Sequence, residues 1–265
     1  TDYIDLYQIQ WPNPLVPISA SIEELIRLRQ EGKCRAIGVS NLSEVDLEKA
    51  IEASGGSIAT LQLRYSISNY LYSENISEMC RANSIIPIAY GGLEGRHFRK
   101  KFDDSAWLAS LARKYGLNLS QFMLNWIVKK AQFMALTRTT NFDHLLQNVG
   151  AVEYELEEAD YAILEQNLAR QVIFLSPSEI DVVAEDADST HVIYTSLEDA
   201  LSNPLAVCPS PSDLARDLLA TKKLLRPIEV VWSPQKNGYR LIQGRMRFWA
   251  WQIAFGHEPI PAIVQ

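Results

Sequence analysis

Hydrophobic and polar residues along positions 3–168 predict strands and helices in regular succession. Short apolar runs typical of buried strands occur at 3–10, 35–40, 58–65, 85–90 and 133–137. The stretches between them carry apolar residues at helical spacing, as at Ile22, Leu25, Ile26 and Leu28. Because strands that alternate with helices of this length form parallel βαβ units, the pattern predicts an α/β fold.

Two helix starts carry capping signals. Ser21 and Glu24 have the spacing of a capping box, so we expect a helix from Ser21 to Gly32. Ser212 precedes a second helical pattern, which predicts a helix over 213–224 capped by that serine.

Five strands in series, with polar candidate residues at their carboxyl ends, suit a (β/α)8 barrel better than an open sheet. No G-x-G-x-x-G pattern follows any of these strands, which disfavours a dinucleotide-binding sheet of the doubly wound kind. At 265 residues the chain is long enough for one or two domains.

The pattern changes after residue 172. It predicts a strand-like stretch with a turn at 173–180, a hairpin of strands 227–232 and 239–243, a helix over 245–255 and a last strand at 260–264. This is the pattern of a small α+β domain. We therefore divide the chain into a barrel portion (1–170), a connector with the first strand of the second domain (171–208) and a C-terminal core (209–265).

Charge supports a boundary near residue 170. The whole chain has 25 basic and 32 acidic residues, a net charge of −7. Residues 171–208 hold seven acidic side chains and no Lys or Arg, whereas 209–265 hold eight basic and four acidic ones. The acidic stretch is interpreted either as a solvated loop or as a connector to a basic face that meets a phosphate-bearing ligand. The excess of basic charge falls far short of a typical DNA-binding surface.

Composition narrows the class further. Hydrophobic residues make up 47% and charged residues 22%, the balance of a globular protein. No apolar run approaches the ~20 residues of a membrane span, and no signal-peptide pattern is visible. Three widely spaced cysteines and four scattered histidines favour reduced thiols in the cytoplasm and no metal site.

Several motifs in order resemble the aldo-keto reductase family. They are Asp2-Tyr-Ile-Asp-Leu-Tyr-Gln-Ile-Gln-Trp-Pro12, the segment 31–41, Leu61-Gln-Leu-Arg-Tyr65, the segment 88–93 and the segment 141–148. The resemblance implies strands four to eight of a (β/α)8 barrel and an NADP(H)-dependent carbonyl reductase.

The resemblance also implies site residues. The nicotinamide carboxamide would be held by Ser40, Asn41 and Gln62, and Tyr90 would stack on the nicotinamide ring. The cofactor's ribose phosphate would be contacted by Arg138, Thr139, Gln147 and Asn148, with Arg138 pairing with a 2′-phosphate.

The catalytic set of that family departs from this sequence. Its Asp, Tyr and Lys lie before strand four, and its His corresponds to Gln10, which can donate a hydrogen bond but cannot titrate near neutral pH. We therefore expect a poor reductase. Tyr65 and Asp5 are the nearest substitutes, and Asp5 is expected to buttress the barrel. An incomplete barrel would need a missing N-terminal half, a partner chain or a second copy to cover it.

Residues 171–265 resemble the ParB/sulfiredoxin-like fold, through the segments 226–231, 237–250 and 259–264. That resemblance implies that Gly244, Arg245 and Arg247 place a nucleotide phosphate, of ATP or CTP, on a helix N-terminus. Arg245 and Met246 stand where that family has Glu and Arg, and its reactive Cys is absent, which disfavours sulfiredoxin activity.

Three functions stay open. The first is an aldo-keto reductase-like oxidoreductase fused to a nucleotide-binding module. The second is an ATP- or CTP-binding regulatory or DNA-associated protein with a degenerate barrel as scaffold. The third is a small nucleotide-using enzyme.

Overall fold

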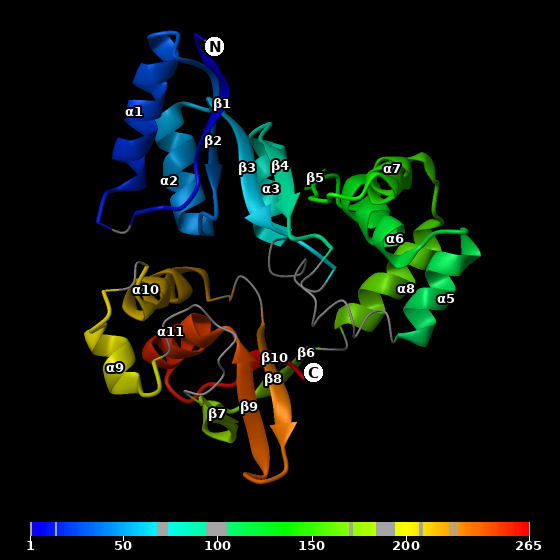
Figure 1. Cartoon of the computed structure of the whole chain (residues 1–265). Coiled ribbons are helices and arrows are strands. Elements are labelled where there is room, and N and C mark those ends of the chain that lie inside the picture. Colours follow the sequence, from blue (N-terminus) through cyan, green and yellow to red (C-terminus); the bar gives the residue numbers. More distant parts are fainter. Residues whose placement is uncertain are drawn as a thin grey trace. The chain divides into compact units, whose positions relative to one another are not determined.

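A computed structural model gives the structure of the chain (Figure 1). It describes residues 2–13, 15–67, 74–93, 105–169, 172–183, 194–206, 209–222, 224 and 227–264. The chain forms two compact units: residues 1–12, 18–42 and 46–169 make the first, and residues 13–17, 43–45 and 170–265 the second. The predicted domain limits fall at residues 170, 171 and 208, which lie outside the described residues, and they remain predictions.

The first unit contains a five-stranded parallel sheet with the strand order β1-β2-β3-β4-β5. The strands are β1 (Ile4–Ile9), β2 (Cys34–Ser40), β3 (Ile58–Arg64), β4 (Ile86–Tyr90) and β5 (Met134–Leu136). The first helices are α1 (Ile18–Gln30), α2 (Glu44–Ser54) and α3 (Glu74–Ala82), and α1 and α2 lie beside β1 and β2 in Figure 1. The parallel sheet confirms the predicted α/β fold.

The core of this sheet follows from its apolar runs. Ile37, Val39 and Leu61 are fully buried in β2 and β3, as are Ile22 of α1 and Leu47 of α2. A parallel strand that is covered on both faces needs apolar residues at nearly every position, which β2 supplies.

Gly38 occupies a position on β2 where only a glycine fits. In the register of the sheet, Gly38 lies between Gln8 of β1 and Thr60 of β3. The Gln8 side chain donates a hydrogen bond to Thr60 Oγ1 across the strand, at 2.8 Å. A Cβ atom on Gly38 would lie 2.2 Å from Thr60 Oγ1 and 2.8 Å from Gln8 Cγ. The missing side chain on β2 therefore makes room for a hydrogen bond that joins β1 to β3.

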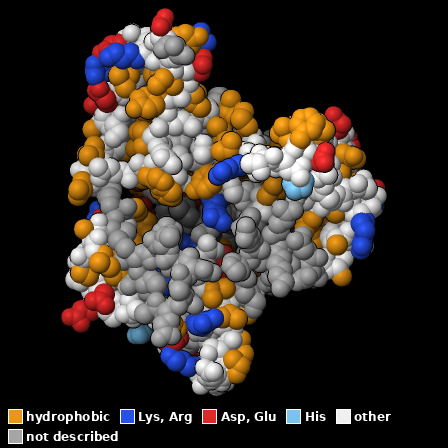
Figure 2. All heavy atoms as spheres, in the orientation of Figure 1, with side chains coloured by type: hydrophobic (Ala, Val, Ile, Leu, Met, Phe, Trp, Pro, Cys, Tyr) orange, Lys and Arg blue, Asp and Glu red, His pale blue; other side chains and the backbone are white. Residues whose placement is uncertain are grey.

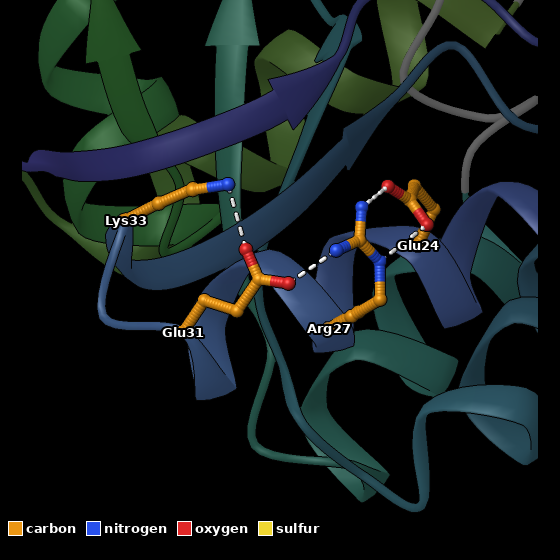
Figure 3. Close-up of polar contacts among 4 residues, drawn as sticks. All are labelled: Glu24, Arg27, Glu31 and Lys33. Carbon is orange, nitrogen blue, oxygen red and sulfur yellow. Dashed lines mark hydrogen bonds and ion pairs between the residues drawn. The ribbon is translucent and has the colours of Figure 1, made fainter.

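The predicted start of the first helix is wrong by one turn. The helix begins at Ile18 rather than at Ser21, because burying Ile18, Ile22 and Leu25 along one face extends it toward the N-terminus. Glu24 is consequently inside the helix, where it pairs with Arg27 (Figure 3). Arg27 also pairs with Glu31, which in turn contacts Lys33 at 2.6 Å. These exposed ion pairs form a solvated face.

The remaining helices of the first unit are α5 (Ala106–Lys114), α6 (Leu119–Asn125), α7 (Phe142–Gly150) and α8 (Glu158–Ala169). A π-helical turn, Trp126–Lys130, follows α6, and a 3-10 turn, Ala151–Glu153, follows α7. The fully buried Asn125 joins these segments. Its side-chain nitrogen donates to the carbonyl oxygens of Ala151 (2.8 Å) and Tyr154 (2.9 Å), and its oxygen accepts from the Tyr161 hydroxyl (2.6 Å).

The second unit holds a mixed sheet with the order β6-β10-β8-β9-β7. Its elements are β6 (Val172–Leu175), β7 (Ile180–Asp181), α9 (Leu197–Ser202), α10 (Pro211–Thr221), β8 (Ile228–Ser233), β9 (Gly238–Gln243), α11 (Arg245–Phe255) and β10 (Ile260–Val264). The predicted hairpin, the helix over 245–255 and the last strand are confirmed. The prediction that Ser212 caps α10 is wrong: Ser210 is the cap and forms the capping box with Asp213.

None of the helices in the described part of the chain combines the length and the apolar character that crossing a membrane requires.

Candidate functional site

The carboxyl ends of the parallel strands bring polar side chains to one edge of the first sheet. Ser40 ends β2 and is paired in register with Gln62 of β3. Tyr90 ends β4 and is paired with Arg64, two residues beyond Gln62. Gln10 directly follows β1. Because strands in a parallel sheet run the same way, these residues meet at the same edge.

The side-chain amide of Asn41 links this edge together. Its nitrogen donates to the backbone carbonyl oxygen of Gln10 and to Ser40 Oγ, each at 3.0 Å. Its oxygen accepts a hydrogen bond from the Tyr90 hydroxyl at 2.8 Å. The backbone N–H of Asn41 donates to the Gln62 carbonyl oxygen at 3.0 Å. Four of the residues predicted for the site thus contact the fifth, Asn41.

The backbone of Asn41 is left-handed, with φ at 57°. Asparagine tolerates this conformation better than most residues with a side chain. The turn directs the chain from the end of β2 toward α2 while keeping the amide at the strand edge. Gln62 is half-buried, and its side-chain amide makes no hydrogen bond to the residues that the structure describes, so it is available to a ligand.

Of the residues predicted to contact a ribose phosphate, Arg138 and Thr139 lie between β5 and α7, whereas Gln147 and Asn148 lie in the last part of α7. Arg138 is exposed and forms no ion pair within the described ranges. Thr139 Oγ1 accepts from the backbone N–H of Asn141 (3.1 Å), the residue that caps α7. Gln147 on α7 accepts a hydrogen bond from Asn118 at 3.0 Å, and Asn148 is half-buried beside it. Only Arg138 combines a positive charge with free access.

The two substitutes considered for a proton donor are in unsuitable places. Tyr65 is 5% exposed and stacks on Phe133, with ring centroids 4.0 Å apart, and on Trp126. Asp5 does not buttress the interior, because its side chain is exposed and pairs with Arg35 at 2.9 Å. Tyr65 therefore serves packing, and Asp5 serves the surface.

A lysine, a tyrosine and an aspartate that the sequence did not single out contact one another at the end of α5 and on α8, away from the strand ends. Lys114 Nζ lies 2.7 Å from the buried Asp160, and the Tyr115 hydroxyl donates to the same carboxylate. The hydrogen bond from Lys114, with that from Tyr115, lowers the pKa of Asp160. Burial and the bond to Asp160 raise the pKa of Tyr115, which makes it a weaker acid.

This cluster joins the end of α5 to the start of α8, since the Glu157 backbone N–H also donates to the Tyr115 hydroxyl at 3.0 Å. Basic residues at the end of one helix and acidic residues at the start of another are a signal that could have revealed it. Its contacts hold two helices together.

In the second unit, Gly244 caps α11 with a left-handed backbone, φ 101°, and no side-chain cap. A Cβ on Gly244 would lie 2.7 Å from Arg247 Nη2, so the guanidinium lies directly over the glycine. Arg247 also donates to the Pro227 carbonyl oxygen, and Arg245 is buried. Gly244 and Arg247 are thus brought together, whereas Arg245 belongs to the core.

No cluster of three metal-ligating side chains occurs among the described residues. Cys34 and Cys80 are buried as free thiols, and burial raises the pKa of Cys80 to about 12. The third, Cys208, lies outside the described residues. A thiol with a raised pKa is a poor nucleophile.

Comparison with known proteins bears on the first unit. Residues 1–169 match the model of the Aldo/keto reductase family. Methylglyoxal reductase YeaE of Escherichia coli (strain K12) is 26% identical over 168 residues, which cover 63% of this chain and 59% of that protein. Methylglyoxal reductase DkgB of Salmonella typhimurium (strain LT2) is 29% identical over 163 residues, 60% of this chain and 58% of that protein.

The fold has solved counterparts as well. An aldo/keto reductase from Klebsiella pneumoniae, solved in complex with NADP and acetate, has a TM-score of 0.58 and 28% sequence identity. The likeness covers 63% of this chain and 60% of that one. The chain therefore spans about three fifths of the length of the relatives it matches.

Proposed function

The chain belongs to the aldo/keto reductase family, and we propose that its first unit binds NADP(H) at the carboxyl edge of the sheet and forms part of a carbonyl reductase. The observation that carries the proposal is the set of hydrogen bonds around Asn41, which brings Gln10, Ser40 and Tyr90 to the same place as Gln62. We propose also that the five strands are strands four to eight of a (β/α)8 barrel.

The chemistry of these residues fits the cofactor. A carboxamide offers one acceptor and two donor hydrogens, and the amides of Asn41 and Gln62 with the hydroxyl of Ser40 match both kinds of group. Arg138, exposed ahead of the N-terminus of α7, suits a 2′-phosphate, because a guanidinium forms charge-assisted hydrogen bonds with phosphate oxygens. When bound, NADPH supplies the hydride for carbonyl reduction.

We propose that the described residues bind NADP(H) but catalyse carbonyl reduction only slowly. Gln10 can orient a carbonyl by donating a hydrogen bond, but it cannot supply a proton. Tyr65 is buried and Tyr115 has a raised pKa, so neither serves as a tuned acid. Since general acid catalysis contributes about 10²–10⁴-fold, its absence would leave a slow reductase.

The test is a titration with NADPH followed by quenching of tryptophan fluorescence. We expect saturable quenching, weakened about tenfold or more in Arg138→Ala through the loss of a charge-assisted contact. Arg113→Ala, an exposed arginine on α5, is the matched control and should bind as the wild type does. Absence of quenching in the wild type would refute cofactor binding.

The relatives named methylglyoxal reductases suggest a small dicarbonyl as the substrate. We expect methylglyoxal to cause little NADPH oxidation with these 265 residues alone. Turnover at about 1 s⁻¹ or faster, the range of ordinary enzymes, would contradict the proposed deficiency while supporting the substrate.

For the second unit we propose a ParB-like fold that binds a nucleotide phosphate, of ATP or CTP, at the start of α11. The supporting observation is the guanidinium of Arg247 over the left-handed Gly244, at a helix N-terminus without a side-chain cap. Titration with each nucleotide tests it: Arg247→Ala should lose binding, and Arg216→Ala, an exposed arginine on α10, should retain it. No binding by the wild type would refute this function, and with it the regulatory, DNA-associated and nucleotide-using alternatives.

We propose finally that another polypeptide surface, a second copy or another chain, covers the sheet edges of the first unit. Within the described residues, β1 and β5 each pair with one neighbour, and Ile4 and Met134 on them are about half exposed. Figure 2 shows hydrophobic side chains lying open over α7, and the exposed ones are Phe142, Leu145, Leu146 and Val149. Sedimentation at rising protein concentration should reveal self-association, and Leu146→Glu should weaken it. If the protein stays monomeric at every concentration, a second copy is excluded and only a different chain could cover these surfaces.

A further inference from the structure

The orientation of the Asn41 amide is fixed by its neighbours. A backbone carbonyl oxygen can only accept hydrogen bonds, so the atom facing the Gln10 carbonyl at 3.0 Å must be the amide nitrogen. The amide oxygen then faces the Tyr90 hydroxyl, which donates to it at 2.8 Å. The assignment follows from the partners, because the reverse orientation would set oxygen against oxygen at Gln10.

This orientation decides what Asn41 can offer a ligand. Both hydrogens of its nitrogen are used, one by Gln10 and one by Ser40. Its oxygen receives one hydrogen bond from the residues that the structure describes, and a carbonyl oxygen can accept two. Asn41 is therefore an acceptor toward a ligand, and the donor for a ligand's carbonyl oxygen must come from elsewhere. Gln62, which is paired in register with Ser40 and whose backbone carbonyl oxygen accepts from Asn41 N–H, is placed to supply it.

We infer that Tyr90 is a positioning residue that acts through Asn41 and makes this subsite specific for a neutral carboxamide over a carboxylate. The inference rests on the proposed cofactor site. An amide N–H of the ligand would bond to Asn41 Oδ1 while Gln62 donates to its carbonyl oxygen. A carboxylate in the same place would set an oxygen with no hydrogen against Asn41 Oδ1. The second acceptor position of Asn41 Oδ1 would then stay unused, and the two oxygens would repel each other.

The selectivity depends on the Tyr90 hydroxyl as well as on the aromatic ring. The hydroxyl holds the oxygen end of the amide, while Gln10 and Ser40 hold the nitrogen end. Tyr90→Phe keeps the ring but releases the oxygen end, so the acceptor can turn away from the ligand. Asn41→Gly removes the amide altogether and remains compatible with the backbone φ of 57°.

The experiment compares the binding of NADP⁺ with that of its deamidated analogue, nicotinic acid adenine dinucleotide phosphate, by tryptophan fluorescence. We expect the wild type to bind NADP⁺ about tenfold more tightly or better, as the loss of one paired polar contact implies. The ratio should fall to about one in Asn41→Gly and to an intermediate value in Tyr90→Phe, with NADP⁺ still bound. Tyr154→Phe, a tyrosine outside this network, should keep the wild-type ratio.

The outcomes separate the two proposals. Equal binding of the two dinucleotides by the wild type would overturn the selectivity and leave the cofactor site standing. An unchanged ratio in both variants would overturn the role of Tyr90 and Asn41. Binding of neither dinucleotide by the wild type would refute the proposed function and this inference with it.

Discussion

Replacing Gly38 by alanine should destabilise the first unit by about 2–4 kcal/mol. The added Cβ would lie 2.2 Å from Thr60 Oγ1 and 2.8 Å from Gln8 Cγ, well inside contact distance, so both side chains must move. Overpacking of a dense core costs about 1–3 kcal/mol. The displaced side chains also lose the hydrogen bond between Gln8 and Thr60, which contributes about 0.5–1.5 kcal/mol.

Urea unfolding followed by circular dichroism measures this effect, and Gly150→Ala is its matched control. Nothing lies within 4 Å of a Cβ on Gly150, and this residue ends α7 with helical geometry. Alanine there should be neutral or stabilise by about 0.4–1 kcal/mol. Thr60→Ala removes the atom nearest to the new Cβ, so the double variant Gly38→Ala/Thr60→Ala should recover part of the stability that Gly38→Ala loses. A loss below about 1 kcal/mol for Gly38→Ala would contradict the packing argument.

Other predictions compare buried with exposed polar groups. Asn125→Ala should cost about 3–5 kcal/mol in free energy of unfolding, because it removes three hydrogen bonds of a fully buried amide. Asn167→Ala, at a partly exposed position on α8, should change stability little, and equal effects of the two substitutions would contradict the argument from burial. Asp160→Asn should destabilise the protein at pH 7. The pKa of Asp160 in the folded protein is lowered from 3.8, so the ionised carboxylate stabilises the fold above pH 3.8 and this stabilisation is lost as the pH falls through the folded pKa. The stabilities of variant and wild type should therefore converge in acid. A difference in stability that does not depend on pH would argue against the ion pair with Lys114. Glu24→Gln, which breaks an exposed ion pair (Figure 3), should leave the unfolding midpoint nearly unchanged, and a marked shift would show that this surface network stabilises the fold.

The parts of the fold that depend on local signals were predictable from the sequence. The helix over 245–255 and the strand over 260–264 have the predicted limits, because Gly244 and Gly256 end the helix on both sides. The helix starts predicted at Ser21 and Ser212 were wrong. Serines recur near both positions, and burial of neighbouring apolar residues, which depends on tertiary packing, decides where each helix begins.

For the candidate site, the sequence predicts which residues stand at the strand ends but not how they contact one another. The motifs placed Ser40, Asn41, Gln62 and Tyr90 at strand ends, and the parallel sheet brings strand ends together. The hydrogen bond from Tyr90 to Asn41 joins residues 49 positions apart, so no local pattern could reveal it. The positive φ of Asn41 follows from that same tertiary arrangement.

The aromatic stack of Tyr65, Trp126 and Phe133 was likewise hidden. Tyr65 ends a strand motif and could serve chemistry or packing when judged from the sequence alone. Its burial depends on the π-helical turn that begins at Trp126, which places a large ring against it. Such a turn has no reliable sequence signal.

The central claim is that the carboxyl edge of the first sheet holds the nicotinamide end of NADP(H). Side-chain amide resonances of Asn41 and Gln62, followed by nuclear magnetic resonance during titration with NADP⁺, test it most directly. We predict that both resonances move with saturation while that of the buried Asn125 amide stays in place. Unmoved resonances of Asn41 and Gln62, with changes confined to residues of the second unit, would contradict it.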